Sequence, residues 1–168
     1  MAKSDDIIKL NKRNIPFCPP DVSELEIAEV ADTLSSGWIT TGPKTKELEK
    51  RLASYCHTSK VVCLNSATAA EKLNFRICGI GAGDEVIVPA YTYTATASAA
   101  IHCGAKVVFV DSQKDRTEMD YDKVATAITE KTKAIVSVDF GGIICDYDRL
   151  FAVGENKRKL FRAKEGKL

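Results

Sequence analysis

Histidine and tryptophan are scarce in this chain of 168 residues, which contains two histidines and one tryptophan. Its six cysteines include no Cys-x-x-Cys pair, so the usual ligand spacing of a zinc cluster is missing. We therefore expect no metal site. We expect reduced, mostly buried cysteines that act as small hydrophobes, with Cys63 and Cys78 inside apolar patterns.

Long apolar runs are missing as well, and none approaches the length of a membrane span. The N-terminal stretch also lacks the apolar core of a signal peptide. The formal net charge is only +1, and no long basic patch is interleaved with aromatic residues. The sequence predicts a cytoplasmic protein whose partners include neither nucleic acid nor membrane.

What the chain does have is a hydrophobic content of 45%, which is enough for the core of one domain of ordinary size. Short, apolar, β-branched segments alternate with helical patterns, and this alternation predicts a parallel sheet with flanking helices. The predicted strands are Val61–Leu64, Glu85–Pro89, Lys106–Val110 and Ala134–Val138.

Six segments are predicted to be helical. A capping box at Ser23–Glu26 begins the first helix, whose apolar residues recur at helical spacing up to Gly37. Asp120 is predicted to cap a helix that contains Val124, Ala127 and Ile128. The other predicted helices are Lys44–Cys56, Thr68–Cys78, Ala95–His102 and a last one that Asp146 caps, from Tyr147 to about Lys159.

The stretch Val61–Ala70 has the layout of a strand, a tight turn and a helix N-terminus. The first turn of a helix has unpaired N–H groups and a partial positive charge, so small residues there let an anion approach the backbone. An ordinary capped turn would have the same pattern. Ligands of parallel sheets bind beyond the carboxyl ends of the strands, where Asn65–Thr68, Tyr91–Thr96 and Asp139–Gly142 are expected to converge.

A loop with two glycines, two threonines and the only tryptophan follows the first predicted helix, at Gly37–Pro43. Such a loop is either a connector or a ligand loop. These motifs, taken together, resemble the N-terminal part of the DegT/DnrJ/EryC1/StrS family of pyridoxal-phosphate-dependent sugar aminotransferases. The resemblance covers about residues 15 to 150. It is carried by the segments 36–43, 65–70, 81–89, 91–97, 104–106, 110–111, 127–129 and 132–135.

The resemblance implies an α/β fold, a partial large domain of the aspartate-aminotransferase type (fold type I) with a mostly parallel sheet. It implies a partial domain for pyridoxal 5'-phosphate at 21–156. The polar, proline-punctuated residues 1–20 predict an N-terminal arm, and the Lys- and Arg-rich residues 157–168 are predicted to be a basic tail and a truncation end. The implied activity is transfer of an amino group from an amino acid such as glutamate to a keto-sugar nucleotide, by a homodimer.

The resemblance also implies roles for individual residues. Ser66, Ala67 and Thr68 match the turn that holds the cofactor phosphate, and Tyr93 matches the aromatic residue that stacks on the pyridine ring. The loop on the substrate side is matched by Trp38, Ile39, Thr40 and Thr41.

The chain lacks both the Schiff-base lysine and the aspartate that partners the pyridine nitrogen, which the family supplies later in its sequence. Lys60, Lys106 and Lys133 are predicted at strand starts, the wrong end of the sheet, and Asp139 is not at the strand end that the family uses. We therefore assign no catalytic residue and predict an inactive fragment with exposed strand edges and apolar faces. The alternatives are a non-catalytic fragment that binds phosphate or cofactor or dimerises, and a dehydratase of the same family.

Overall fold

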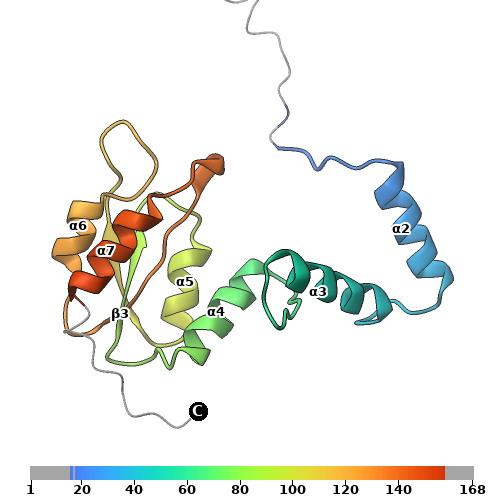
Figure 1. The fold of residues 1–168 in the computed structure, drawn as a ribbon, viewed down its shortest axis with the longest axis horizontal. Helices are drawn as coiled ribbons and strands as arrows, with labels where there is room; N and C mark the ends of the chain where they lie inside the picture. Colours follow the sequence, from blue (N-terminus) through green and yellow to red (C-terminus); the bar gives the residue numbers. More distant parts are fainter. Residues whose placement is uncertain (1–15, 17, 158–168) are drawn as a thin grey trace, which may run out of the picture. The chain divides into compact units, whose positions relative to one another are not determined.

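A computed structural model describes residues 16 and 18–157 (Figure 1). The chain divides into two units between Cys63 and Leu64, and each unit is described by itself. Most of the predicted arm at 1–20 and nearly all of the tail at 157–168 lie outside the described residues. None of the helices within the described ranges combines the length and apolarity needed to cross a bilayer.

The first unit contains two helices, α2 (Glu24–Ser35) and α3 (Pro43–Tyr55). The predicted capping box is confirmed: the Ser23 hydroxyl accepts a hydrogen bond from the first turn, and the Glu26 carboxylate accepts one from the Ser23 N–H. Beyond the end of α2, Gly37 has a φ of 73°, a left-handed conformation that glycine adopts without steric cost. Both helices therefore begin and end close to where the sequence predicts.

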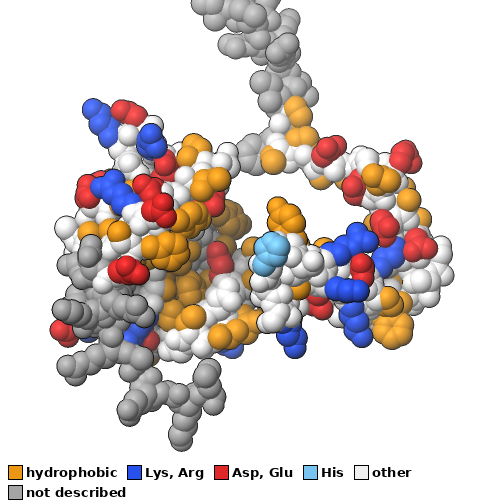
Figure 2. Space-filling view, viewed as in Figure 1, with side chains coloured by type: hydrophobic (Ala, Val, Ile, Leu, Met, Phe, Trp, Pro, Cys, Tyr) orange, Lys and Arg blue, Asp and Glu red, His pale blue; other side chains and the backbone are white. Residues whose placement is uncertain are grey.

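Neither helix of the first unit has a buried residue. The apolar side chains that recur along α2 are exposed to solvent, and Figure 2 shows hydrophobic atoms on the surface of this helix. Leu25 is 75% exposed, and Ile27, Val30 and Leu34 are each more than half exposed. The prediction of uncovered apolar faces is confirmed for this unit.

The predicted strand at Val61–Leu64 is wrong, because these residues have no regular secondary structure. A strand is defined by hydrogen bonds to a neighbouring strand, and none of the described strands pairs with this segment. Its apolar, β-branched composition is suited to a strand, but composition cannot supply the partner.

The second unit contains a three-stranded parallel sheet of β1 (Glu85–Pro89), β2 (Lys106–Val110) and β3 (Thr132–Ile135). The spatial order is β2-β1-β3, so β1 lies in the middle, and all five of its residues are buried. The other elements of this unit are α4 (Ala67–Ile77), α5 (Ala95–His102), α6 (Tyr121–Ala127), the 3-10 turn η1 (Phe140–Gly142) and α7 (Tyr147–Lys157).

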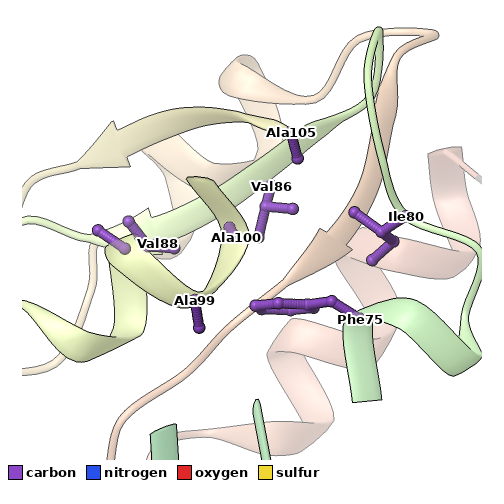
Figure 3. Close-up of a cluster of buried hydrophobic side chains, with 8 residues drawn as sticks. Phe75, Ile80, Val86, Val88, Ala99, Ala100 and Ala105 are labelled. Carbon is purple, nitrogen blue, oxygen red and sulfur yellow. The ribbon is translucent and has the colours of Figure 1, made fainter. Parts of the chain in front are cut away.

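Alternate residues of β1 face two separate hydrophobic clusters, as the period of two in a strand requires. Val86 and Val88 contribute to the first cluster, with Phe75 of α4 and Ala99 and Ala100 of α5 (Figure 3). The second cluster contains residues of β1, β2 and α6 and, packed against it, residues of α7: Ile87, Val110, Met119, Tyr121, Val124, Ile128, Leu150 and Val153. Helices therefore cover both faces of the sheet, the arrangement expected for a parallel sheet.

Two predicted boundaries need correction. The third strand of the sheet is Thr132–Ile135 and not Ala134–Val138. The Val136 N–H still donates to Ile87, but the next group of β1 that would donate to this strand belongs to Pro89, which has no N–H. Ile128 lies just past the end of α6, although it is buried in the second cluster as an apolar helix residue would be.

The cysteine prediction is also wrong in part. All six thiols are free, but only Cys145 is buried. Cys63 is intermediate, and Cys78, the residue after α4, is exposed. An apolar sequence context does not bury a cysteine by itself, because burial requires a neighbouring element that packs on it. The described part of the chain provides no such element for Cys78.

Candidate functional site

The N-terminus of α4 has the geometry of an anion-binding turn, which we call the phosphate turn (Ser66–Thr68). Ser66 is the N-cap: its hydroxyl accepts a hydrogen bond from the Ala69 N–H (3.1 Å) and its carbonyl accepts one from the Ala70 N–H (3.1 Å). The N–H groups of Ala67 and Thr68 therefore remain without a partner among the described residues.

These two N–H groups lie at the positive end of the dipole of an 11-residue helix. The Thr68 side chain is half-buried, and no other described residue bonds to its hydroxyl. Two backbone donors and one hydroxyl beside side chains no larger than threonine match what a phosphate group requires. The residues present therefore fit the phosphate of the implied cofactor.

The segment between β1 and α5 holds Tyr93, the predicted stacking residue. Its side chain is 79% exposed, so its ring is accessible to a planar ligand. The hydroxyls of Thr92 and Thr96 are 3.2 Å apart, and this hydrogen bond joins the segment to the first turn of α5.

The convergence predicted at the carboxyl ends of the strands is confirmed for two of the three segments. Tyr91, after β1, packs against Phe140, in the segment that follows β3, with ring centroids 4.8 Å apart. Among the described residues, no ring contact and no backbone hydrogen bond joins the phosphate turn to either of these two segments.

Asp139 has a local structural role in this segment. Its carboxylate accepts hydrogen bonds from the Cys145 N–H (2.9 Å) and from the Tyr147 hydroxyl (3.0 Å). The Cys145 N–H is the main cause that holds the pKa of Asp139 below its usual value, and the Tyr147 hydroxyl adds to it. These contacts close the chain around η1. The contact with Tyr147 could not be predicted from the sequence, because Tyr147 begins α7 while Asp139 precedes η1, and no periodic pattern links residues of two different elements.

The predicted substrate loop lies in the first unit. The Trp38 backbone N–H donates to the Ser36 hydroxyl (3.2 Å), and its indole N–H donates to the Thr41 carbonyl (3.0 Å). Ile39, Thr40 and Thr41 are exposed. A cavity of about 260 Å³ is lined by Trp38, Ile39, Thr40 and neighbouring residues of α2 and α3. The loop is thus an ordered turn that presents an aromatic ring and hydroxyl groups.

The lysines near the sheet have other surroundings. Lys106 is the first residue of β2 and forms an ion pair with the buried Glu85 carboxylate (2.9 Å). Lys133 is the second residue of β3. Both lie toward the amino ends of the strands, as predicted, whereas Lys60 precedes a segment that is not a strand.

A family model for the DegT/DnrJ/EryC1/StrS aminotransferase family matches residues 20–160. The chain belongs to this family. A relative from Bacillus subtilis, the spore coat polysaccharide biosynthesis protein SpsC, is 42% identical over 88% of this chain and 38% of its own length. The UDP-4-amino-4-deoxy-L-arabinose–oxoglutarate aminotransferase of Shewanella sediminis is 43% identical over 84% of this chain and 36% of its own.

Solved structures of the family share the fold. A putative sugar aminotransferase from Streptococcus pneumoniae, known in forms with pyridoxal phosphate and with pyridoxamine phosphate, is 62% identical with a TM-score of 0.86. The match covers 92% of this chain and 39% of that structure. The fold prediction is confirmed: this is part of a fold type I domain, from a family whose cofactor is pyridoxal 5'-phosphate. The chain spans less than two-fifths of the length of these relatives.

Proposed function

We propose that this chain is the cofactor-phosphate-binding part of a sugar-nucleotide aminotransferase. The observation that carries the proposal is the phosphate turn, where the Ala67 and Thr68 N–H groups and the Thr68 hydroxyl are available to an anion. The family match supports the identity of that anion as the phosphate of pyridoxal phosphate.

In this proposal each group has a defined task. Ser66 caps α4 and keeps the first turn in place, Ala67 and Thr68 bind the phosphate, and Tyr93 packs on the pyridine ring. When bound, pyridoxal phosphate supplies an electron-withdrawing ring that stabilises negative charge on the substrate. Trp38, Ile39, Thr40 and Thr41 contact the substrate.

The proposed substrates are a keto-sugar nucleotide and an amino-acid donor such as glutamate. The Shewanella sediminis relative is named for UDP-4-amino-4-deoxy-L-arabinose and oxoglutarate, and this name supports the proposed substrate class. We place the enzyme in the cytoplasm and propose that it acts as a homodimer, to which the uncovered apolar face of α2 is suited. Residues 21–156 are proposed as its partial cofactor-binding domain.

We also propose that these 168 residues do not catalyse the reaction alone, because the sequence contains neither the lysine nor the aspartate motif of the family. The test is a titration of the chain with pyridoxal phosphate, followed by absorbance, with inorganic phosphate as competitor. We expect weak binding that phosphate displaces and no spectral change on adding glutamate. A glutamate-dependent change would overturn the proposed inactivity, and binding that phosphate does not displace would overturn the role of the phosphate turn.

A dehydratase of the same family is the second candidate. The structure of the GDP-4-keto-6-deoxy-D-mannose-3-dehydratase of Escherichia coli, with hydrated pyridoxal phosphate bound, has a TM-score of 0.78 at 25% identity. Sequencing the DNA downstream of codon 168 would decide between the two. A continuing frame with a lysine at the Schiff-base position favours the aminotransferase, and a histidine there favours the dehydratase.

A further inference from the structure

Gly42 lies directly beneath the indole of Trp38. A Cβ atom at position 42 would be 2.2 Å from Trp38 Cδ1 and 2.5 Å from Nε1, distances that real Cβ atoms essentially never show. Gly42 is also buried, although Trp38 and the three residues after it are exposed. The indole itself thus packs on the bare backbone of Gly42.

Backbone strain does not explain the glycine at this position. The φ of Gly42 is −142° and its ψ is −159°, an extended conformation that any residue adopts. Gly42 is the N-cap of α3, where serine or threonine would be at least as favourable as glycine. The contact with the indole is therefore the feature of this position that requires a residue without a side chain.

Two hydrogen bonds also hold Trp38, one through its indole and one through its backbone. Its ring N–H donates to the Thr41 carbonyl, and the Trp38 backbone N–H donates to the Ser36 hydroxyl, which in turn donates to the Thr33 carbonyl (2.7 Å). Trp38 nevertheless remains 57% exposed. The side chain is therefore fixed on the Gly42 side, while more than half of its surface remains open to a ligand.

The geometry points to Gly42 as a positioning residue that sets the orientation of Trp38 for the substrate. This inference rests on the proposed function, in which Trp38 contacts the sugar nucleotide. Any side chain at position 42 displaces the indole from the Thr41 carbonyl and changes the wall of the cavity that Trp38 lines. Gly42 itself acts only through the position of Trp38.

Trp38 is the only tryptophan of the chain, so its fluorescence reports on this turn alone. The experiment compares acrylamide quenching and the emission maximum of the unaltered chain with those of Gly42→Ala and Gly42→Ser. Alanine is a poorer N-cap than glycine, and serine is a better one. The two variants therefore change the stability of the α3 N-terminus in opposite directions, while both add a Cβ. We expect both to raise the quenching constant and to shift the emission to longer wavelength.

Gly154→Ala is the matched control. Gly154 lies in α7, and a Cβ added there meets no heavy atom within 4 Å, so its quenching should equal that of the unaltered chain. Unchanged quenching in both Gly42 variants would overturn the inference. In the unaltered chain, the indole N–H should exchange with solvent more slowly than in a synthetic peptide of residues 36–43. Equal exchange rates would also overturn the inference, and this measurement does not depend on how the variants fold.

Titration with UDP-glucose, as a nucleotide-sugar probe, separates the inference from the proposed function. A change in Trp38 fluorescence in the unaltered chain that is lost in both Gly42 variants supports both. If the unaltered chain does not respond to the probe while the Gly42 variants still expose the indole, the substrate role of Trp38 fails and the packing of Trp38 on Gly42 stands.

Discussion

The rings of Tyr91 and Phe140 pack against each other with centroids 4.8 Å apart and an angle of 53° between their planes. This contact joins the segment after β1 to the segment that follows β3. Such tilted aromatic pairs add about 0.5–1.5 kcal/mol beyond the area they bury. The pair thus holds together two of the segments that the sequence places beyond the carboxyl ends of the strands.

The first prediction concerns this contact between the Tyr91 and Phe140 rings. In a double-mutant cycle of Tyr91→Ala and Phe140→Ala, we expect a coupling free energy of about 0.5–1.5 kcal/mol in urea unfolding. Tyr93→Ala combined with Phe140→Ala is the control, because no ring contact joins these two residues in the described structure. Equal coupling in both cycles would show that the contact is not specific.

The second prediction concerns the phosphate turn in a full-length family enzyme that contains this segment. Thr68→Val should weaken binding of pyridoxal phosphate by about 1–3 kcal/mol, the usual cost of losing one charge-assisted hydrogen bond. The dissociation constant is measured by absorbance titration. The control is Thr126→Val, whose hydroxyl donates to the Lys123 carbonyl in α6. Unchanged affinity in Thr68→Val would remove Thr68 from the site.

The third prediction concerns the centre of the sheet. Ile87 is fully buried in β1, so Ile87→Ala should lower the free energy of unfolding by about 2–5 kcal/mol. Ile101 in α5 is 57% exposed, and Ile101→Ala should change it by less than about 0.5 kcal/mol. Urea unfolding of both variants measures the difference. Similar losses would contradict the assignment of the core.

The fourth prediction concerns pH. The Thr129 hydroxyl (2.7 Å) and then the Lys106 ammonium lower the pKa of the buried Glu85 carboxyl in the folded chain. A lowered folded pKa means that this stabilisation is complete above the unfolded pKa, about 4.3, and is lost as the pH falls through the folded pKa. Glu85→Gln should therefore be less stable than the unaltered chain at neutral pH, with a difference that shrinks in acid.

Unfolding measured at several pH values between neutral and strongly acidic checks this expectation. Thr129→Val, which removes the larger cause of the shift, should reproduce much of the effect. Parallel stability curves for Glu85→Gln and the unaltered chain across this range would show that Glu85 does not contribute to the acid sensitivity.

Local sequence signals predicted most of the second unit. The segments Glu85–Pro89, Lys106–Val110 and Ala95–His102 have the predicted bounds, because the strands are short apolar runs and the helix is followed by glycine. The start of α4 at Ala67 also agrees with the predicted start at Thr68 to within one residue. Each of these features depends on the residues of one segment and on its nearest neighbours in the chain.

The errors share a different physical cause. Val61–Leu64 has the composition of a strand but no neighbouring strand in the described chain, and the ladder of β3 stops early because Pro89 lies opposite it. Cys78 has an apolar context but no element that covers it. Pairing and burial are properties of two segments together, which the pattern of one segment cannot specify.

The sequence by itself determined the order of the helices and of the three strands of the sheet, the caps at Ser23 and Asp120, the helix N-terminus at the phosphate turn and the family resemblance, since all of these depend on local residue types and spacing. Only the tertiary structure decided that β1 lies between β2 and β3, that Tyr91 meets Phe140, and that the Trp38 indole packs on Gly42. These relationships depend on distances between atoms that the chain brings together only when it folds.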